Sequence, residues 1–247
     1  MPREILLLTG ASSDLGLALM RRLIALPDPP LVIAHGHGGL ERIRAVAGEP
    51  GGGAVQPIAA DFSDRESVAA MAERIQAEHG SPTQIVHLPG LKLIYERFPR
   101  FSWEHFQRDL AIQVQSAVIL LQRFLPRMAK LPRAKVVFVL SSVTRGVPPK
   151  FLSMYTTIKH TQLGLMRALA SEYAGTGVTV NAVSPSMVGT RFLQDLPEVA
   201  VEMAAANSPR KRHATPEEVV GAIAFLLSPD SDYINGAEIP VTAGSAF

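Results

Sequence analysis

Short apolar runs alternate along the chain with longer segments in which apolar residues recur every three or four positions. A short apolar run bounded by turn residues is typical of a buried strand, whereas the longer spacing is typical of a helix with one packed face. The pattern predicts strands at residues 4–8, 31–34, 55–59, 85–88, 136–140, 178–183 and 239–241. It predicts helices at about 15–26, 40–47, 63–79, 102–128 and 151–173, and a last helix from residue 215 onward.

This repeated alternation predicts parallel strands with helices on both faces of the sheet. Right-handed crossovers then give an α/β fold with one doubly wound Rossmann-type sheet, which we expect to occupy residues 1–247 as a single domain. Two helix starts carry clear signals. Ser63 with Glu66 predicts a capping box, and Thr215 followed by a proline and two glutamates predicts a second capped start.

Composition narrows the class of protein. The chain is 47% hydrophobic and 19% charged, which is ordinary for a soluble domain, and its net charge of +2 is too small to indicate nucleic acid as a partner. It has no cysteine, which excludes a disulfide framework, a thiolate metal site and a cysteine nucleophile. No apolar run approaches the roughly 18 residues of a membrane span, so we expect a cytoplasmic protein without a membrane partner.

The first strand leads into its helix through a glycine-containing loop, residues 9–16. Gly10 permits a tight turn after the strand, and Gly16 lets the helix approach the sheet closely. The amides and the dipole at the helix N-terminus would then face a pyrophosphate, although an ordinary strand–helix turn is the alternative. Asp14 lies where the helix dipole favours a carboxylate, and we expect it to point outward as a cap.

Tyr155 and Lys159 lie four residues apart in a predicted helix and therefore share one face. A nearby ammonium stabilises a phenolate and lowers the tyrosine pKa from its usual value near 10, which suits proton transfer to or from a substrate oxygen. Ser142 follows the fifth strand, where its hydroxyl can bind the same oxygen. Such a tyrosine–lysine pair also occurs by chance as a solvated pair, but the glycine loop and the serine favour the catalytic interpretation.

With these motifs the chain resembles the short-chain dehydrogenases/reductases of the small, single-domain kind, along essentially its whole length. The positions that carry the resemblance are residues 9–16, Asp61, Phe62, Ser141, Ser142, Tyr155, Lys159, residues 181–185, Thr190 and residues 233–244. Within that family the chain is similar to 3-oxoacyl-acyl-carrier-protein reductases.

The resemblance implies a role for each catalytic position. Tyr155 would be the general acid in reduction, and Lys159 would hold the nicotinamide ribose and tune the tyrosine. Ser142 would orient the substrate carbonyl. Gln113 aligns with the family's helix asparagine, which anchors a proton-relay water, so we include it among the catalytic residues.

The resemblance also implies a set of cofactor contacts. They are Gly10, Ser12, Ser13, Asp14, Leu15, Gly16, Asp61, Phe62, His87, Gly90, Tyr155, Lys159, Pro185, Val188 and Thr190. Two of these depart from the family pattern: Asp14 replaces a glycine of the loop, and His87 replaces an asparagine after the fourth strand. His87 is either a substitute cofactor contact or a buried ring.

The end of the second strand bears on the choice of cofactor. An NAD-preferring enzyme usually has a carboxylate there for the 2′-hydroxyl, whereas this chain has Gly36. We therefore favour NADP(H) over NAD(H), with His35, His37 or Arg42 as contacts of the 2′-phosphate. A plain polar loop is the alternative for the histidines. A metal pair lacks an evident third ligand, so we expect no metal.

Residues 187–212 are expected to form a lid over the substrate. Apolar residues such as Phe192 and Leu196 suggest a pocket wall or simple packing, and the basic cluster Arg210–Arg212 would suit an acyl carrier protein or be a solvated run.

The expected reaction is NADPH-dependent reduction of a ketone, best a 3-oxoacyl thioester. Alternatives are a dehydrogenase of sugars, steroids or small alcohols, a sugar-nucleotide epimerase, and a catalytically idle NADP(H)-binding sensor or assembly protein. We expect a homodimer or homotetramer.

Overall fold

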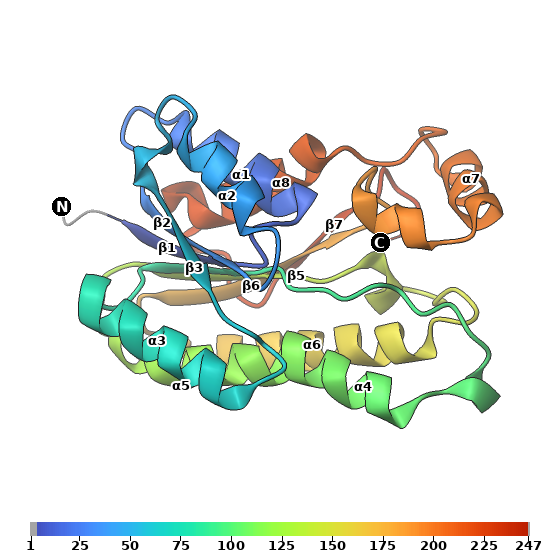
Figure 1. Ribbon diagram of the computed structural model, residues 1–247, viewed down its shortest axis with the longest axis horizontal. Helices are drawn as coiled ribbons and strands as arrows, with labels where there is room; N and C mark the ends of the chain where they lie inside the picture. Colours follow the sequence, from blue (N-terminus) through green and yellow to red (C-terminus); the bar gives the residue numbers. More distant parts are fainter. Residues whose placement is uncertain (1–3, 247) are drawn as a thin grey trace.

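The computed structural model describes residues 4–246, and its centre is a seven-stranded parallel sheet in the order β3-β2-β1-β4-β5-β6-β7 (Figure 1). The strands are β1 (Ile5–Thr9), β2 (Leu31–Gly36), β3 (Val55–Ala59), β4 (Gln84–His87), β5 (Ala134–Val139), β6 (Val178–Pro185) and β7 (Glu238–Val241). The strand order reverses between β1 and β4, which creates a switch point where ligands of such sheets bind. The expected doubly wound α/β fold is confirmed.

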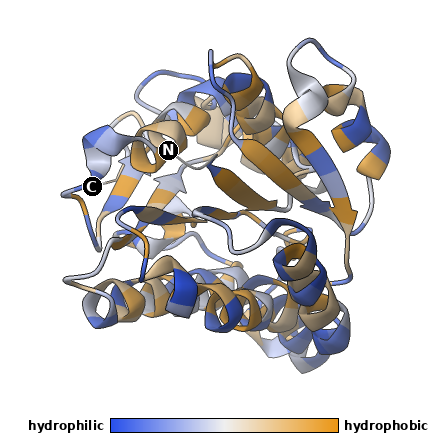
Figure 2. Cartoon of the chain, turned by 90° about the vertical axis from the view of Figure 1, so that its left-hand side faces the viewer, coloured by the Kyte–Doolittle hydropathy of each residue, from blue (hydrophilic) through white to orange (hydrophobic). Residues whose placement is uncertain are grey.

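Helices cover both faces of this sheet in two layers (Figure 1). One layer holds α1 (Asp14–Ile24), α2 (Leu40–Ala47) and α8 (Pro216–Leu227), and the other holds α3 (Arg65–His79), α4 (Trp103–Leu110), α5 (Ser116–Met128) and α6 (Ser153–Glu172). Figure 2 shows the apolar strands between these layers. The short helix α7 (Glu198–Asn207) stands apart from both layers, in the segment expected to form the lid.

Alternate side chains of each central strand feed two separate cores. Leu6 and Leu8 of β1 pack in the core beneath α1 and α8, whereas Leu7 packs in the core on the α3, α5 and α6 side. Because both faces are covered, every residue of β5 and β6 is buried. Continuous apolar strands of this kind are expected in parallel sheets.

Of the two expected helix starts, one is confirmed and the other is wrong. Thr215 and Glu218 form the predicted capping box of α8. The cap of α3 is Asp64, whose side chain accepts from the Glu66 amide, so the assignment of Ser63 as the cap was wrong. Ser63 instead donates from its amide and its hydroxyl to Asp61, in an Asx turn that competes with the helix for that side chain.

The long helix expected at residues 102–128 is interrupted. After α4, residues Ala111–Gln115 form a π-helical turn, η3, before α5 continues to Met128. A π turn inserts an extra residue into the helix and misaligns its carbonyl groups from their usual partners. Within residues 4–246, no helix is both long enough and apolar enough to cross a membrane.

Candidate active site

Four strand ends and the lid segment enclose one cavity of about 430 Å³. It lies at the carboxyl edge of the sheet, where the register sets Thr9 beside His87 and His87 beside Phe138. The walls come from the glycine loop, the segments after β4, β5 and β6, and α6. The predicted catalytic and cofactor residues among its lining are Ser13, Asp14, Leu15, Gly90, Ser142, Tyr155, Lys159, Pro185, Val188 and Thr190. Phe192 and Leu196, suggested as a pocket wall, also line it.

The glycine loop is shaped as a close-fitting cradle. Gly10 has a φ of +71°, and a Cβ there would lie 3.0 Å from the backbone of Leu88 and Pro89. A Cβ on Gly16 would lie 2.5 Å from the Ala11 carbonyl oxygen, so α1 can approach the loop only with glycine at this position. Ser13, Asp14 and Leu15 at the start of α1 border the cavity, and a helix N-terminus in this place fits a diphosphate group.

Asp14 is a junction between three segments. Its carboxylate accepts from Arg42 Nη2 at 2.6 Å and from the Arg191 amide at 2.7 Å, and Arg191 Nε lies 3.4 Å away. Burial acts to raise the pKa of Asp14, but the hydrogen bonds from Arg42 and Arg191 outweigh it and lower that pKa. The expected outward cap is wrong, because Ser13 caps α1 and Asp14 joins the loop to α2 and the lid.

The tyrosine–lysine pair lies on the first turns of α6. Tyr155 is partly buried in the cavity wall, with Ser142 in the same lining. Lys159 is only 4% exposed, and its Nζ lies 5.7 Å from the centroid of the Tyr155 ring. The ammonium donates to the Val139 carbonyl at 3.2 Å and to Gln162 Oε1 at 3.0 Å. Two of its three N–H groups are thus used inside the protein.

The pKa of the tyrosine moves opposite to the direction expected from its sequence. Burial raises the pKa of Tyr155 to about 12, with Asp109 adding to the rise and a hydrogen bond with Ser141 opposing it. Burial also lowers the pKa of Lys159 to about 8, against the pull of the Asp109 carboxylate. The predicted depression was wrong because desolvation outweighs the groups that stabilise the phenolate. A protonated phenol and a lysine that is mostly ammonium at neutral pH result.

Gln113 lies in the π turn, where its backbone carbonyl becomes the acceptor of two side chains. His87 Nε2 and Gln162 Nε2 both bind the Gln113 carbonyl oxygen at 2.9 Å. The Gln113 side chain turns instead to Asp109, with its Nε2 2.5 Å from Oδ1. Its own Oε1 is buried without a hydrogen-bond partner. The position identified from the sequence thus contributes through its carbonyl group to a buried polar cluster.

Two of the proposed cofactor histidines are interior rings. His87 binds Thr9 Oγ1 through Nδ1 at 3.0 Å in addition to the Gln113 carbonyl, so both of its nitrogens are engaged. His35 stacks on Phe62 at 3.7 Å, accepts from the Gly10 amide and binds the Ala60 carbonyl. Burial lowers the pKa of His87 to about 3 and that of His35 to about 4, which keeps both neutral. Of the alternatives left open for His87, the geometry matches the buried ring.

The ends of β2 and β3 present a polar edge. The His37 side chain is exposed, and its Nδ1 lies 4.0 Å from Asp61 Oδ1. Hydrogen bonds from Ser63 lower the pKa of Asp61, so this carboxylate is ionised. Arg42 reaches the glycine loop, where it donates to the Ser12 carbonyl as well as to Asp14. His37 and Arg42 therefore remain the candidates for a 2′-phosphate, whereas His35 has no ring nitrogen to offer.

Sequence reasoning missed two polar residues of the site, Asp109 and Gln162, and gave no role to Ser141. Each influences Tyr155 or Lys159, through a hydrogen bond or through charge. Gln162 lies three residues after Lys159 on α6, which is one helical turn away. That spacing was the available signal, but it could not show which way the amide points.

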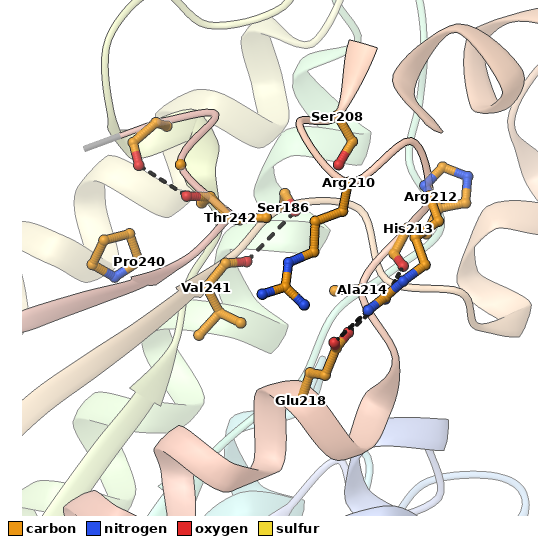
Figure 3. Close-up of a pocket in the computed structure, with 13 residues that line it drawn as sticks. Ser186, Ser208, Arg210, Arg212, His213, Ala214, Glu218, Pro240, Val241 and Thr242 are labelled. Carbon is orange, nitrogen blue, oxygen red and sulfur yellow. Dashed lines mark hydrogen bonds and ion pairs between the residues drawn. The ribbon is translucent and has the colours of Figure 1, made fainter. Parts of the chain in front are cut away.

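A second cavity, of about 470 Å³, lies beside β7 and the end of the lid segment (Figure 3). Arg210 extends into it towards Val241, whereas Arg212 forms an ion pair with Glu218 at 2.6 Å. Lys211 donates to the Ala206 carbonyl. Of the basic cluster noted in the sequence, Arg210 and Arg212 thus line this cavity, and Arg212 is paired there with Glu218.

Comparison with known proteins identifies the family of the chain. Residues 30–246 match the family model described as enoyl-(acyl carrier protein) reductase. A cis-4-hydroxycyclohexanecarboxylate dehydrogenase from Sinomonas cyclohexanicum is 30% identical over 98% of this chain and 96% of its own. The 3-oxoacyl-acyl-carrier-protein reductase FabG of Thermotoga maritima is 28% identical over 98% of this chain and 97% of its own.

Among solved structures, a putative NAD(P)-dependent gluconate 5-dehydrogenase from Beutenbergia cavernae, with bound NADP at low occupancy, superimposes with a TM-score of 0.87. It is 29% identical and covers 98% of this chain, which in turn covers 96% of it. The family match spans most of the chain, and the fold agrees with it. The chain therefore belongs to the short-chain dehydrogenase/reductase family and is an NAD(P)-dependent oxidoreductase of alcohols or ketones.

Proposed function

We propose that this enzyme reduces a ketone to a secondary alcohol with NADPH, and that a 3-oxoacyl thioester is its substrate. The observation that carries the proposal is the shared cavity, which is lined both by the glycine cradle and by Ser142, Tyr155 and Lys159. A dinucleotide seated on the cradle would therefore have its reactive end within the same space as the catalytic side chains.

Tyr155, Ser142 and Lys159 each have a separate role in the proposed ketone reduction. When bound, a reduced nicotinamide would supply the hydride for the carbonyl carbon. Tyr155 donates its phenolic proton to the carbonyl oxygen, which completes the alcohol, and a raised pKa keeps that proton in place at neutral pH. Ser142 donates a hydrogen bond that orients the carbonyl. The remaining N–H of Lys159 would hold the ribose hydroxyls.

The preference for NADPH rests on the polar edge at β2. Gly36 leaves the position of the usual carboxylate empty of charge, and His37 and Arg42 lie on the same edge. Our proposed contacts for the rest of the cofactor are Asp61, Phe62, Gly90, Pro185, Val188 and Thr190.

The proposed thioester is supported by the apolar wall of Leu93, Leu152 and Leu196 and by relatives such as the Thermotoga maritima reductase. We further propose a cytoplasmic homodimer or homotetramer.

The test is loss of reduced-nicotinamide absorbance with acetoacetyl thioesters and a panel of simple ketones. Wild-type turnover should fall roughly 100- to 10,000-fold in Tyr155→Phe, because the variant lacks the proton donor. Tyr173→Phe is the matched control, since this tyrosine lies at the far end of α6 and outside the cavity lining. Turnover that survives in Tyr155→Phe would contradict the assignment.

The second candidate is a catalytically idle NADP(H)-binding protein. The observation that favours it is Asp14, whose negative charge stands in a loop built for a diphosphate. Tight NADPH binding by calorimetry, with no turnover of any thioester, ketone, sugar, steroid or small alcohol, would support this candidate. Turnover of one compound class would identify the substrate and dismiss it.

A further inference from the structure

On its interior side, the Lys159 ammonium contacts the side-chain amide of Gln162. Gln162 Oε1 accepts from Lys159 Nζ at 3.0 Å, and Gln162 Nε2 donates to the Gln113 carbonyl at 2.9 Å. Gln162 is 1% exposed, so its side chain is fixed between the ammonium and the π turn. One glutamine therefore joins the catalytic lysine to a backbone carbonyl of η3.

The chemistry of an amide limits what this bridge can do. A primary amide donates through nitrogen and accepts through oxygen, but neither atom gains or loses a proton readily near neutral pH. A hydroxyl or a water in the same place could pass a proton from one neighbour to the next. The Gln162 amide can hold the ammonium in position but cannot carry a proton past it.

His87 and Asp109 also lie on the interior side of Lys159, and both are already engaged in hydrogen bonds. His87 is neutral and donates to the Gln113 carbonyl, which already accepts from Gln162. Asp109 is bound by the Gln113 side chain and acts on Lys159 through charge. The ionisable groups around Lys159 are therefore Asp109 from α4, His87 from β4 and Tyr155 from α6.

We propose that Gln162 is a positioning residue that anchors Lys159 to the Gln113 carbonyl as a bridge without proton transfer, so that Tyr155 regains its proton through the open cavity. With Val139 and Gln162 binding two N–H groups, one N–H of the ammonium is left for the cavity that Lys159 lines. The second half of the proposal rests on the proposed reduction, in which Tyr155 gives up a proton for each carbonyl reduced.

The anchoring half can be tested without turnover. In cofactor-free protein, the Lys159 pKa is measured from the NMR shift of ¹³C-labelled lysine ε carbons, assigned with Lys159→Met. Gln162→Leu removes an acceptor and should lower the Lys159 pKa by roughly one to two units. Gln162→Glu places a carboxylate there and should raise it. Opposite shifts distinguish anchoring from simple packing, since both variants would disturb packing.

Gln107→Leu is the matched control, because Gln107 lies exposed on α4. Thermal melting shows whether each variant is folded, and Gln162→Glu keeps the test open if Gln162→Leu is not. A Lys159 pKa that is unchanged, or shifted in the same direction by both variants, would overturn the anchoring role.

The proton route is tested in the active enzyme. Gln162→Leu should reduce kcat roughly 10- to 100-fold with little change in the KM of the ketone, because a charged hydrogen bond is lost behind the site. Rates of the wild type in mixtures of H₂O and D₂O should fall linearly with deuterium content, as for one transferred proton. A bowl-shaped dependence, which shows that more than one proton moves in the rate-limiting step, would overturn the route through the cavity. If no substrate turns over, the proposed function fails while the lysine titration still decides the anchoring.

Discussion

Asp14 and Arg191, which lie 177 positions apart in the sequence, are joined by a hydrogen bond from the Arg191 amide and by an ion pair to its guanidinium. The first residue opens α1 beside the glycine cradle, and the second opens η5 (Arg191–Asp195) on the lid segment. The contact ties the expected lid segment to the loop in which we propose that a diphosphate lies. A cofactor can enter the cradle only alongside this tie or by loosening it.

Loss of the carboxylate should loosen the lid. In Asp14→Asn the partly buried ion pairs with Arg42 and Arg191 are lost, so we expect trypsin to cleave within residues 191–212 about three to ten times faster in cofactor-free protein. Limited proteolysis followed by mass spectrometry measures this rate. Asp28→Asn, in an exposed turn, is the control. Equal cleavage of both variants and the wild type would show that the tie does not restrain the lid.

Cofactor preference should respond to a carboxylate at the end of β2. We expect Gly36→Asp to change the ratio of the NADPH and NADH dissociation constants roughly 10- to 100-fold in favour of NADH, since the carboxylate binds a 2′-hydroxyl and repels a 2′-phosphate. A Cβ at this position lies 3.1 Å from the Gly38 carbonyl oxygen, so a small shift is required. Gly36→Ala isolates that steric effect, and a ratio that moves equally in both variants would contradict the charge argument.

Reduction should have a basic limit set by Lys159. Its pKa of about 8 in the cofactor-free protein means that the ammonium loses its proton above that pH, whereas Tyr155, with a pKa of about 12, stays protonated. We expect kcat/KM for ketone reduction to be level from pH 6 to about 7.5 and to decline above about pH 8. A pH profile of kcat/KM measures this. A rate that rises through this range would conflict with an ammonium requirement.

Acid should destabilise the fold through two interior histidines. Burial lowers the pKa of His87 to about 3 and of His35 to about 4, so below the ordinary value of 6.5 the unfolded chain binds protons that the folded chain does not. Stability is full above that value and falls as the pH drops, by about 2 kcal/mol for each ring at pH 5.

Urea unfolding at neutral and acidic pH measures this loss. His87→Gln should remove about half of the pH dependence, at the cost of some stability at pH 7, whereas His105→Gln on the exposed side of α4 should leave it unchanged. A stability that is the same at both pH values would show that neither ring is neutral and buried in solution.

The sequence was sufficient for the features that depend on local periodicity. Continuous apolar runs and a glycine loop predict parallel strands and their switch point, and the Tyr155–Lys159 spacing predicts a shared helix face. The sequence was insufficient where the state of a side chain depends on residues that approach it only in the folded protein. The direction of the Tyr155 pKa shift depends on the balance of burial and charge, and the Gln113 carbonyl in the π turn binds His87 and Gln162, which come from other elements.

The same limit explains Asp14 and His35. From the sequence, Asp14 could be an outward helix cap and His35 could lie in a polar loop. In the structure Asp14 binds Arg191 and His35 binds Ala60, both distant in the sequence. Ser63 shows the effect at short range, since its hydroxyl binds Asp61 and leaves the cap of α3 to Asp64. Polar side chains near strand ends were therefore the least predictable part of the site.

The central place of β1 bears on how the chain folds as it is synthesised. The four strands up to β4 form neighbouring members of the sheet, so the first third of the chain can pair its strands before the rest exists. β5, β6 and β7 then add in chain order along one edge. The Asp14–Arg191 contact can form only after β6 has been made, because Arg191 follows it. We therefore expect the cradle to be built early and the lid to be secured near the end of synthesis.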